Sequence, residues 1–124
     1  MTTVRLLLVE DSDFLGTQLQ DALRGYNFTV DVVSTARAAE RHVAQRGVDC
    51  VVTNYDLPDE TGIKLARNLP DSLPILLLTT TKLESIASEA LDAGVTDFVH
   101  KDNIVGKMNI VANRVSVAVR AGRQ

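Results

Sequence analysis

Short apolar runs alternate along the chain with segments whose apolar residues recur every three or four positions. The apolar runs predict five β-strands, at Val4–Val9, Phe28–Val33, Asp49–Thr53, Pro74–Thr79 and Thr96–His100. The first, third and fourth runs are continuously apolar, a pattern typical of parallel strands that are covered on both faces. These three strands are therefore expected in the interior, between two layers of other elements.

A segment with helical spacing follows each apolar run. The apolar stripes of these segments predict five amphipathic helices, at Leu15–Leu23, Ala36–Val43, Leu65–Leu69, Leu83–Leu91 and Ile104–Val119. Thr35 is suited to cap the second helix at its N-terminus. Gly25, Pro70 and Gly94 are typical of the residues at which helices end. Strand and helix thus alternate five times.

This strict alternation predicts an α/β fold. Right-handed crossovers place helices on both faces of a mostly parallel sheet, and five strands favour a doubly wound, flavodoxin-like sheet of order 2-1-3-4-5. Ligands of such folds bind in the crevice at the carboxyl ends of strands 1 and 3. The sequence shows no linker, so we expect a single domain over residues 1–124, with its core at about residues 4–120.

The composition is that of an ordinary globular protein and excludes several other classes. The net charge is −3 and the isoelectric point is about 5.3, which argues against a nucleic-acid-binding protein with a broad basic face. Cys50 is the single cysteine, so the chain forms no internal disulfide or cysteine-based zinc cluster. The apolar runs are too short to span a bilayer, and the first residues lack the layout of a signal peptide. We therefore expect a cytoplasmic protein.

Polar and charged residues stand where the predicted strands end. Glu10 and Asp11 follow the first strand, Asn54 follows the third, Thr79 ends the fourth and Lys101 follows the fifth. Because parallel strands end at the same edge of a sheet, we expect these side chains to converge in one shallow pocket. Adjacent carboxylates form a hard oxygen site that suits Mg²⁺. The metal ion, Thr79 and Lys101 would together accept a phosphate-like anion.

Other polar residues have simpler interpretations. Asp59 and Glu60 are interpreted as part of a solvated loop, and His42 as a surface residue of a helix. Cys50 lies within an apolar strand and is interpreted as an inert core thiol. The acidic residues after the first strand have a simpler alternative too, as solvated side chains near a helix start.

With these residues in place, the chain resembles the receiver domain of response regulators from Val4 to about Arg120. Five features in the family's order and spacing carry the resemblance: Glu10-Asp11 after Leu-Leu-Leu-Val, Leu57-Pro58 followed by Gly62, Thr79, the segment Ala93–Phe98, and Lys101. The resemblance implies that Glu10 and Asp11 hold Mg²⁺ and that Thr79 and Lys101 contact phosphoryl oxygens. It also implies that Thr79 and Phe98 switch the output surface.

Asn54 departs from that family at its phosphate-accepting position. The family's aspartate lies four residues before the proline that is Pro58 here, and an asparagine amide cannot form an acyl phosphate as a carboxylate does. We therefore expect no phosphorylation at Asn54 and a weakened Mg²⁺ site, with Asn54 and the backbone carbonyl of Asp56 among the ligands. The chain is then either a natural atypical receiver or one altered at this position, and Asp56 is an alternative acceptor. A second departure is Lys101-Asp102, where the family has Lys-Pro.

The resemblance implies a non-enzymatic receiver that relays a signal through protein–protein contacts in a two-component phosphorelay. Its implied partner is a sensor histidine kinase or another signalling protein, with a homodimer through helix 4, strand 5 and helix 5 as a further expectation. Direct binding to nucleic acid or to a membrane is not expected. The alternative is a flavodoxin-like module that binds a small ligand or nucleotide. The glycine-poor first turn, Val9–Asp13, counts against this alternative because its carboxylates repel a nucleotide phosphate.

Overall fold

The structure, a computed structural model, describes residues 3–79, 83–100 and 108–122. Its elements follow one another in the order β1 (Val4–Val9), α1 (Asp13–Arg24), β2 (Phe28–Val33), α2 (Ala36–Gln45), β3 (Cys50–Asn54), α3 (Gly62–Asn68), β4 (Ile75–Thr79), α4 (Leu83–Asp92), β5 (Asp97–His100) and α5 (Met108–Gly122). The five strands of the described chain are parallel and lie in the order β2-β1-β3-β4-β5. The predicted doubly wound sheet with five helices is therefore confirmed.

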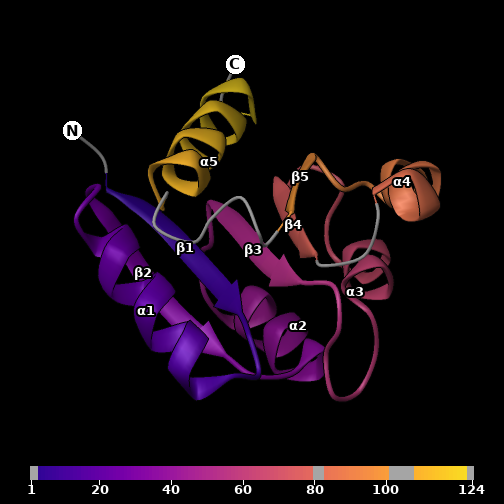
Figure 1. The fold of residues 1–124 in the computed structure, drawn as a ribbon, viewed down its shortest axis with the longest axis horizontal. Helices are drawn as coiled ribbons and strands as arrows, with labels where there is room; N and C mark the ends of the chain where they lie inside the picture. Colours follow the sequence, from indigo (N-terminus) through magenta and orange to yellow (C-terminus); the bar gives the residue numbers. More distant parts are fainter. Residues whose placement is uncertain (1–2, 80–82, 101–107, 123–124) are drawn as a thin grey trace.

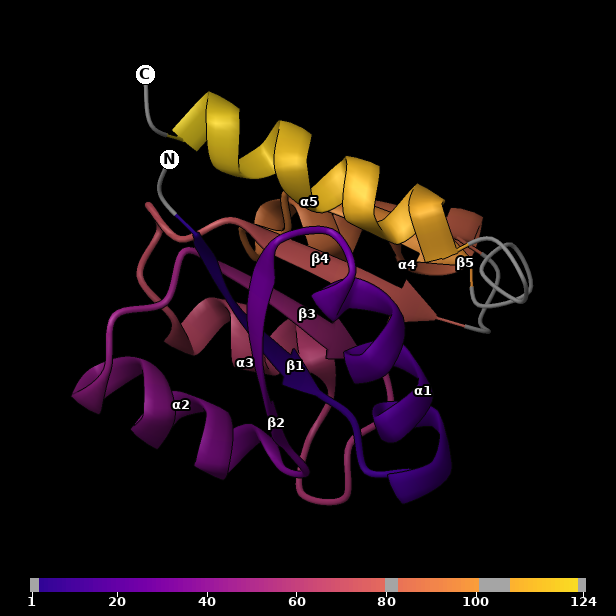
Figure 2. The same ribbon diagram turned by 90° about the vertical axis from the view of Figure 1, so that its left-hand side faces the viewer.

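The sheet separates two layers of helices (Figure 1, Figure 2). Helices α1 and α5 cover one face, and α2, α3 and α4 cover the other. Successive residues of β1 alternate between the layers: Leu6 and Leu8 join the first core cluster, whereas Leu7 and Val9 join the second. Burying such a side chain contributes about 1.5–3 kcal/mol. Because both faces are covered, the central strands are apolar at every position rather than at every second one.

A hydroxyl side chain caps each of the helices α1, α2 and α3 at its N-terminus. The hydroxyl oxygen accepts a hydrogen bond from the backbone N–H three residues along: Ser12 from Leu15 (3.2 Å), Thr35 from Ala38 (3.0 Å) and Thr61 from Lys64 (3.2 Å). Each cap satisfies a backbone donor that has no partner within the helix. The predicted cap at Thr35 is confirmed.

The turns after α1 and α4 each contain one residue with a left-handed backbone conformation, but the residue type differs. Gly94, after α4, has φ of +94°, a conformation that other residues rarely adopt. Gly25, predicted to stop α1, caps that helix with φ of −67°, so it does not need glycine's freedom. The left-handed residue of this turn is Asn27, with φ of +68°, because asparagine tolerates that region better than most side chains.

Several details differ from the pattern-based expectations, among them the start of α3 at Gly62 rather than Leu65. Strand β3 continues to Asn54, one residue beyond the apolar run, because Asn54 extends the ladder opposite Leu78. His42 is not a plain surface residue: its side chain is only 16% exposed, and its Nε2 lies 3.4 Å from Oδ2 of Asp31 on β2. The predicted start of the last helix at Ile104 lies outside the described residues. None of the described helices has the length and apolar composition needed to cross a bilayer.

Candidate functional site

Three of the predicted site residues lie side by side at the carboxyl edge of the sheet. Glu10 directly follows β1, Asn54 ends β3 and Thr79 ends β4. The register pairs the last residue of β1 with the residue before Asn54, and pairs Asn54 with Leu78, the residue before Thr79. The order of the parallel strands therefore brings together residues that are far apart in the sequence.

The two acidic residues after β1 differ in their surroundings. Glu10 is 4% exposed, and its Oε1 accepts a hydrogen bond from the backbone N–H of Ser12 (3.2 Å). Its own N–H donates to the carbonyl of Val33 on β2 (2.9 Å). Asp11 is exposed. Local hydrogen bonds thus hold Glu10 in place, whereas solvent reaches Asp11 directly.

Asn54 makes a hydrogen bond that an aspartate cannot make. The residue is 7% exposed, and its Nδ2 donates to the backbone carbonyl of Asp56 over 2.9 Å. A carboxylate has no N–H, so an aspartate here would turn an oxygen atom toward that carbonyl oxygen. The amide therefore ties the end of β3 to the following loop through its own donor.

The loop between β3 and α3, residues 55–61, is held at both ends by backbone bonds. The N–H of Tyr55 donates to the carbonyl of Leu78 (2.8 Å), and the N–H of Gly62 donates to the carbonyl of Tyr55 (2.7 Å). Asp56 and Thr61 face each other in an isolated antiparallel bridge. These bonds connect the two ends of the loop, and the bond from Asn54 to Asp56 connects the loop to β3. The loop therefore has a defined conformation beside the site.

Gly62, the first residue of α3, lies close against the end of β3. A Cβ atom at this position would lie 2.5 Å from the backbone oxygen of Asn54 and 2.8 Å from Cδ1 of Leu77. Both distances are shorter than van der Waals contact. Only glycine therefore allows α3 to begin directly beneath the end of β3.

Asp59, interpreted from the sequence as part of a solvated loop, has a structural role. Its two carboxylate oxygens accept hydrogen bonds from the backbone N–H groups of Ala36 (Oδ1) and Arg37 (Oδ2), each over 2.9 Å. These two donors, Ala36 first, hold the pKa of the Asp59 carboxyl below its ordinary value because they favour the charged form. Helix α2 has no acidic residue in its own first turn. Asp59 therefore supplies a negative charge at the N-terminus of α2, where a helix favours one.

The remaining predicted residues lie on or after β4 and β5. Thr79 is fully buried and stands opposite His100 in the β4–β5 ladder. Phe98 is half-buried and packs against the second core cluster, the one beneath α2, α3 and α4. Lys101 and Asp102 lie outside the described residues.

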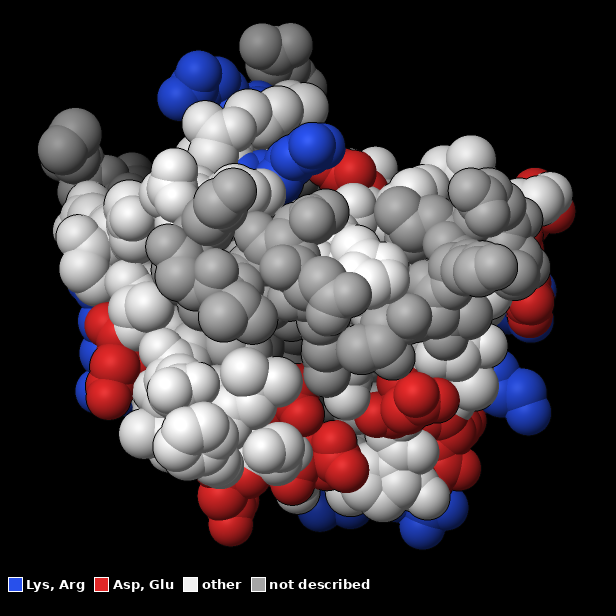
Figure 3. Space-filling view, viewed as in Figure 1, with Lys and Arg blue, Asp and Glu red and all other residues white. Residues whose placement is uncertain are grey.

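The residues that follow β1 and end β3 carry oxygen atoms of the kind that Mg²⁺ prefers. Glu10 and Asp11 bring carboxylates, Asn54 an amide oxygen and Asp56 a backbone carbonyl, all hard oxygen ligands. Figure 3 shows acidic side chains gathered over the loops that follow β1 and β3. Within the described part of the chain, no three His, Cys, Asp or Glu side chains form a metal-binding group. The donor set therefore fits Mg²⁺ in type, with one negative charge fewer than an aspartate at position 54 would give.

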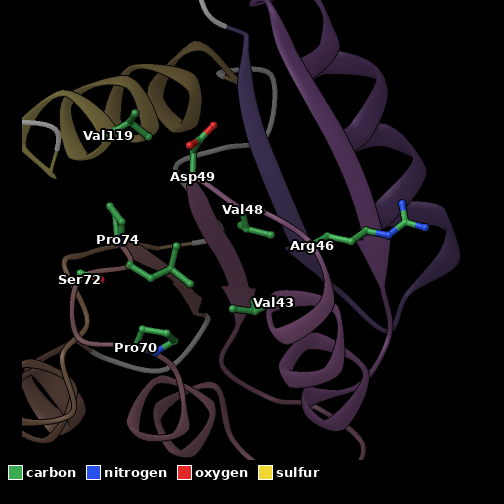
Figure 4. Close-up of a pocket in the computed structure, with 10 residues that line it drawn as sticks. Val43, Arg46, Val48, Asp49, Pro70, Ser72, Pro74 and Val119 are labelled. Carbon is green, nitrogen blue, oxygen red and sulfur yellow. The ribbon is translucent and has the colours of Figure 1, made fainter.

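A cavity of about 320 Å³ lies at the opposite edge of the sheet (Figure 4). Asp49 and Pro74, which precede β3 and β4, line it together with Val119 of α5. The side chain of Arg46 points away from it and across toward β2. Because this cavity is at the amino ends of the strands, it is separate from the residues gathered at the carboxyl ends.

Comparison with known proteins decides the family. The model of the response regulator receiver domain matches residues 6–112 of the chain. The chain belongs to this family. Receiver domains are signalling modules of two-component systems, and they generally bind Mg²⁺. The matches do not favour the alternative of a flavodoxin-like ligand-binding module.

Relatives and solved structures agree with this assignment. The virulence transcriptional regulatory protein PhoP of Salmonella typhimurium and the transcriptional regulatory protein PhoP of Escherichia coli are each 30% identical over 120 residues, which cover 91% of this chain and 54% of the relative. The chain thus spans about half the length of these curated relatives.

Two crystal structures show the same fold at lower identity. The signal receiver domain of an HD domain-containing protein from Pseudomonas fluorescens superposes with a TM-score of 0.87 at 21% identity, covering 99% of this chain and 92% of that one. The receiver domain of a sensor histidine kinase from Pseudomonas aeruginosa superposes with a TM-score of 0.83 at 23% identity, covering 95% and 98%. The latter has a magnesium ion coordinated in its active site cleft.

Proposed function

We propose that this receiver transmits its signal without phosphorylation of residue 54. The observation that carries the proposal is the hydrogen bond from Nδ2 of Asn54 to the carbonyl of Asp56 (2.9 Å). Phosphorylation of a receiver needs a carboxylate oxygen that attacks phosphorus while the donor's bond to phosphorus breaks. The nitrogen of Asn54 has no free lone pair for this attack, because the lone pair is delocalised into the amide, and the Nδ2 group donates a hydrogen bond to the carbonyl of Asp56.

The same bond gives the site a fixed shape of its own. Asn54 holds the carbonyl of Asp56, Asp56 bridges to Thr61, and Thr61 caps α3. Asp59, in the same loop, caps α2. The loop thus connects β3, α3 and α2 through side chains and backbone, and we infer that partners recognise this constant shape rather than a phosphorylated one.

Mg²⁺ has a reduced role in this proposal. Glu10 and Asp11 would hold the ion, with the side-chain oxygen of Asn54 and the carbonyl of Asp56 as neutral ligands. When bound, the ion supplies positive charge that neutralises phosphoryl oxygens. A unit charge pair near 4 Å is worth up to about 4 kcal/mol at an effective dielectric constant of about 20. We therefore propose that the missing charge at position 54 weakens Mg²⁺ binding, and that Thr79 and Lys101 have lost their phosphoryl partner.

The proposed output surface is the face made by α4, β5 and α5, through which the chain would contact a sensor histidine kinase, another signalling protein or a second copy of itself. Leu91 on α4 and Val117 on α5 are 60% and 55% exposed, and such apolar side chains favour a protein partner. An ion pair of Arg114 with Asp97 (2.8 Å) joins α5 to β5 on this face. The proposed place of action is the cytoplasm, whose reducing conditions suit the buried free thiol of Cys50.

The test is an NMR comparison with a small phosphodonor. Spectra of the isotope-labelled chain are recorded with Mg²⁺, before and after acetyl phosphate is added. We expect the amide signals around Phe98 and Thr79 to stay in place, and those of an Asn54→Asp variant to move. Large shifts in the parent chain would overturn the phosphate-independent function.

A further inference from the structure

The outer edge of the sheet carries a groove that belongs to no part of the site described above. Strand β2 forms this edge and, among the described strands, pairs only with β1. A groove of about 610 Å³ runs over β2 between α1 and α2, on the side of the molecule that faces the viewer in Figure 2. Glu10, Asn54 and Thr79 are not among the residues that line it.

The backbone of β2 presents hydrogen-bonding groups to this groove. The carbonyl of Val33 accepts from Glu10 and so faces β1. Because backbone groups alternate in direction along a strand, those of Val30 and Val32 face outward. For Val30 a hydrogen bond shows this directly. Its carbonyl accepts from Nε2 of Gln20 on α1 (3.0 Å), which lies on the groove side. An edge with outward backbone groups is a place where another extended chain can pair.

Three arginines make the groove basic although the whole chain has a net charge of −3. Arg24 lies at the end of α1, and Arg41 and Arg46 lie on and just after α2; all three are exposed and line the groove. Within the described residues, none of them has an ion-pair partner. The groove's own carboxylate, Asp31, lies against His42 instead (3.4 Å). The three guanidinium groups can therefore interact with negative charges of a molecule that binds in the groove.

We propose that this groove binds an extended, acidic segment of a partner protein. The segment would pair with the outward backbone groups of β2 as an additional strand, sharing or displacing the bond from Gln20 to the carbonyl of Val30. Its carboxylates would form charge-assisted hydrogen bonds with the guanidinium groups of Arg24, Arg41 and Arg46. Val32 also lines the groove and is 37% exposed, so it offers an apolar contact to a side chain of the bound segment. A peptide fits better than a nucleic acid, because the described residues of the lining include no Phe, Tyr or Trp on which bases would stack.

A binding assay with defined peptides tests this. The probe is a short fluorescent peptide of alternating glutamate and valine, and its binding is followed by polarisation at low salt. Arg24→Gln with Arg41→Gln removes two groove charges, and Arg37→Gln with Arg120→Gln removes the same charge from exposed positions outside the groove. We expect the groove variant to bind at least about tenfold more weakly and the control variant to match the parent. Circular dichroism checks that both variants are folded.

Two further measurements distinguish an acidic peptide from other possible ligands of the groove. In an NMR titration, the amide signals of Val30 and Val32 should move more than those of β5 when the glutamate peptide is added. A lysine–valine peptide and a DNA duplex of equal length should bind more weakly than the glutamate peptide. No binding of the glutamate peptide, equal loss in both arginine variants, tighter binding of DNA, or self-association of the chain through β2 would each overturn the proposal.

Discussion

The amide nitrogen of Asn54 lies 2.9 Å from the carbonyl oxygen of Asp56, two residues along the chain. The donor residue is 7% exposed and the acceptor residue is exposed, so the bond lies at the boundary between the core and the loop. A typical protein hydrogen bond contributes about 0.5–1.5 kcal/mol net to the free energy of unfolding. Position 54 therefore affects the stability of the loop as well as the chemistry of the site.

Asn54→Asp should make the chain less stable in the absence of metal and more responsive to Mg²⁺. The substitution removes the donor and places a third carboxylate near Glu10 and Asp11, so we expect a loss of about 1–3 kcal/mol in the free energy of unfolding in EDTA. Mg²⁺ should then restore stability, by about 2.7 kcal/mol at a hundred times its Kd. Urea unfolding with and without Mg²⁺ measures both effects. A parent chain that gains as much from Mg²⁺ as the variant would contradict the reduced metal role.

Gly62→Ala should destabilise the chain by about 1–3 kcal/mol. The added methyl group would meet the backbone oxygen of Asn54 at 2.5 Å, and neither β3 nor α3 can move away without disturbing the core. Gly16→Ala in α1 is the matched control, because its nearest neighbour would be Cγ1 of Val32 at 3.6 Å. Alanine is a better helix former by about 1 kcal/mol, so the control should be neutral or stabilising in the same urea experiment.

Asp59 should make stability depend on pH in the acidic range. Hydrogen bonds from Ala36 and Arg37 lower the pKa of Asp59 in the folded chain, so the unfolded chain binds a proton more readily. The resulting stability is complete above the unfolded carboxyl's pKa, about 3.9, and is lost as the pH falls through the lower folded pKa. Asp59→Ala should therefore lower the urea midpoint at neutral pH, and its difference from the parent should vanish in strong acid.

Asp71→Asn serves as the control for this experiment, since Asp71 is exposed in the loop before β4. Its urea midpoint at neutral pH should equal that of the parent. A constant difference between Asp59→Ala and the parent down to strong acid would show that Asp59 acts through packing rather than through its charge.

The hydrophobic pattern predicts the fold well because the central strands are covered on both sides. The run Ile75–Leu78 is buried at every position, so its sequence is apolar throughout and its identity as a strand is unambiguous. The placement of Glu10 and Asn54 at one edge follows from the strand order alone. These features depend only on periodicity and topology, which a single sequence displays.

Contacts between segments that are distant in the sequence could not be predicted from the hydrophobic pattern. Asp59 caps a helix that begins 23 residues earlier, and Asp31 meets His42 across the gap between β2 and α2. Both acidic residues look like solvated charges when only their neighbours in sequence are considered. The bond from Asn54 to Asp56 was missed for another reason: it depends on the shape of the loop, which the residue types do not determine.

Cys50 should be unreactive in the folded chain. Burial, and to a smaller extent the charge of Asp49, raises the pKa of its thiol to about 12, so almost no thiolate exists at pH 8. Iodoacetamide reacts with the thiolate, and we expect labelling at pH 8 to be at least about a thousandfold slower in the folded chain than in urea. Mass spectrometry over time measures both rates. Labelling of the folded chain at the rate of the unfolded one would show that β3 is open to solvent.

Asn54→Asp should also restore the ability to accept a phosphoryl group. The carboxylate oxygen would attack the phosphorus of acetyl phosphate, forming an O–P bond as the bond between phosphorus and the acetate oxygen breaks and acetate leaves. Glu10 and Asp11 remain to hold Mg²⁺, and Thr79 stands at the neighbouring strand end, so the nucleophile is the missing part. Intact mass after incubation with acetyl phosphate and Mg²⁺ should show one added phosphoryl group in the variant and none in the parent.

Asp56 supplies the control for this last prediction, because its exposed carboxylate is the alternative acceptor. Adding Asp56→Asn to the Asn54→Asp variant keeps the backbone carbonyl at position 56 and removes only the side-chain charge. The double variant should still gain the phosphoryl group, since the attack comes from position 54. If the parent chain is labelled as fully as the variant, the acceptor is Asp56 or a histidine, and loss of the label with Asp56→Asn would identify Asp56. Asn54 would then be a structural residue beside a working site, and a phosphate-independent function would not hold.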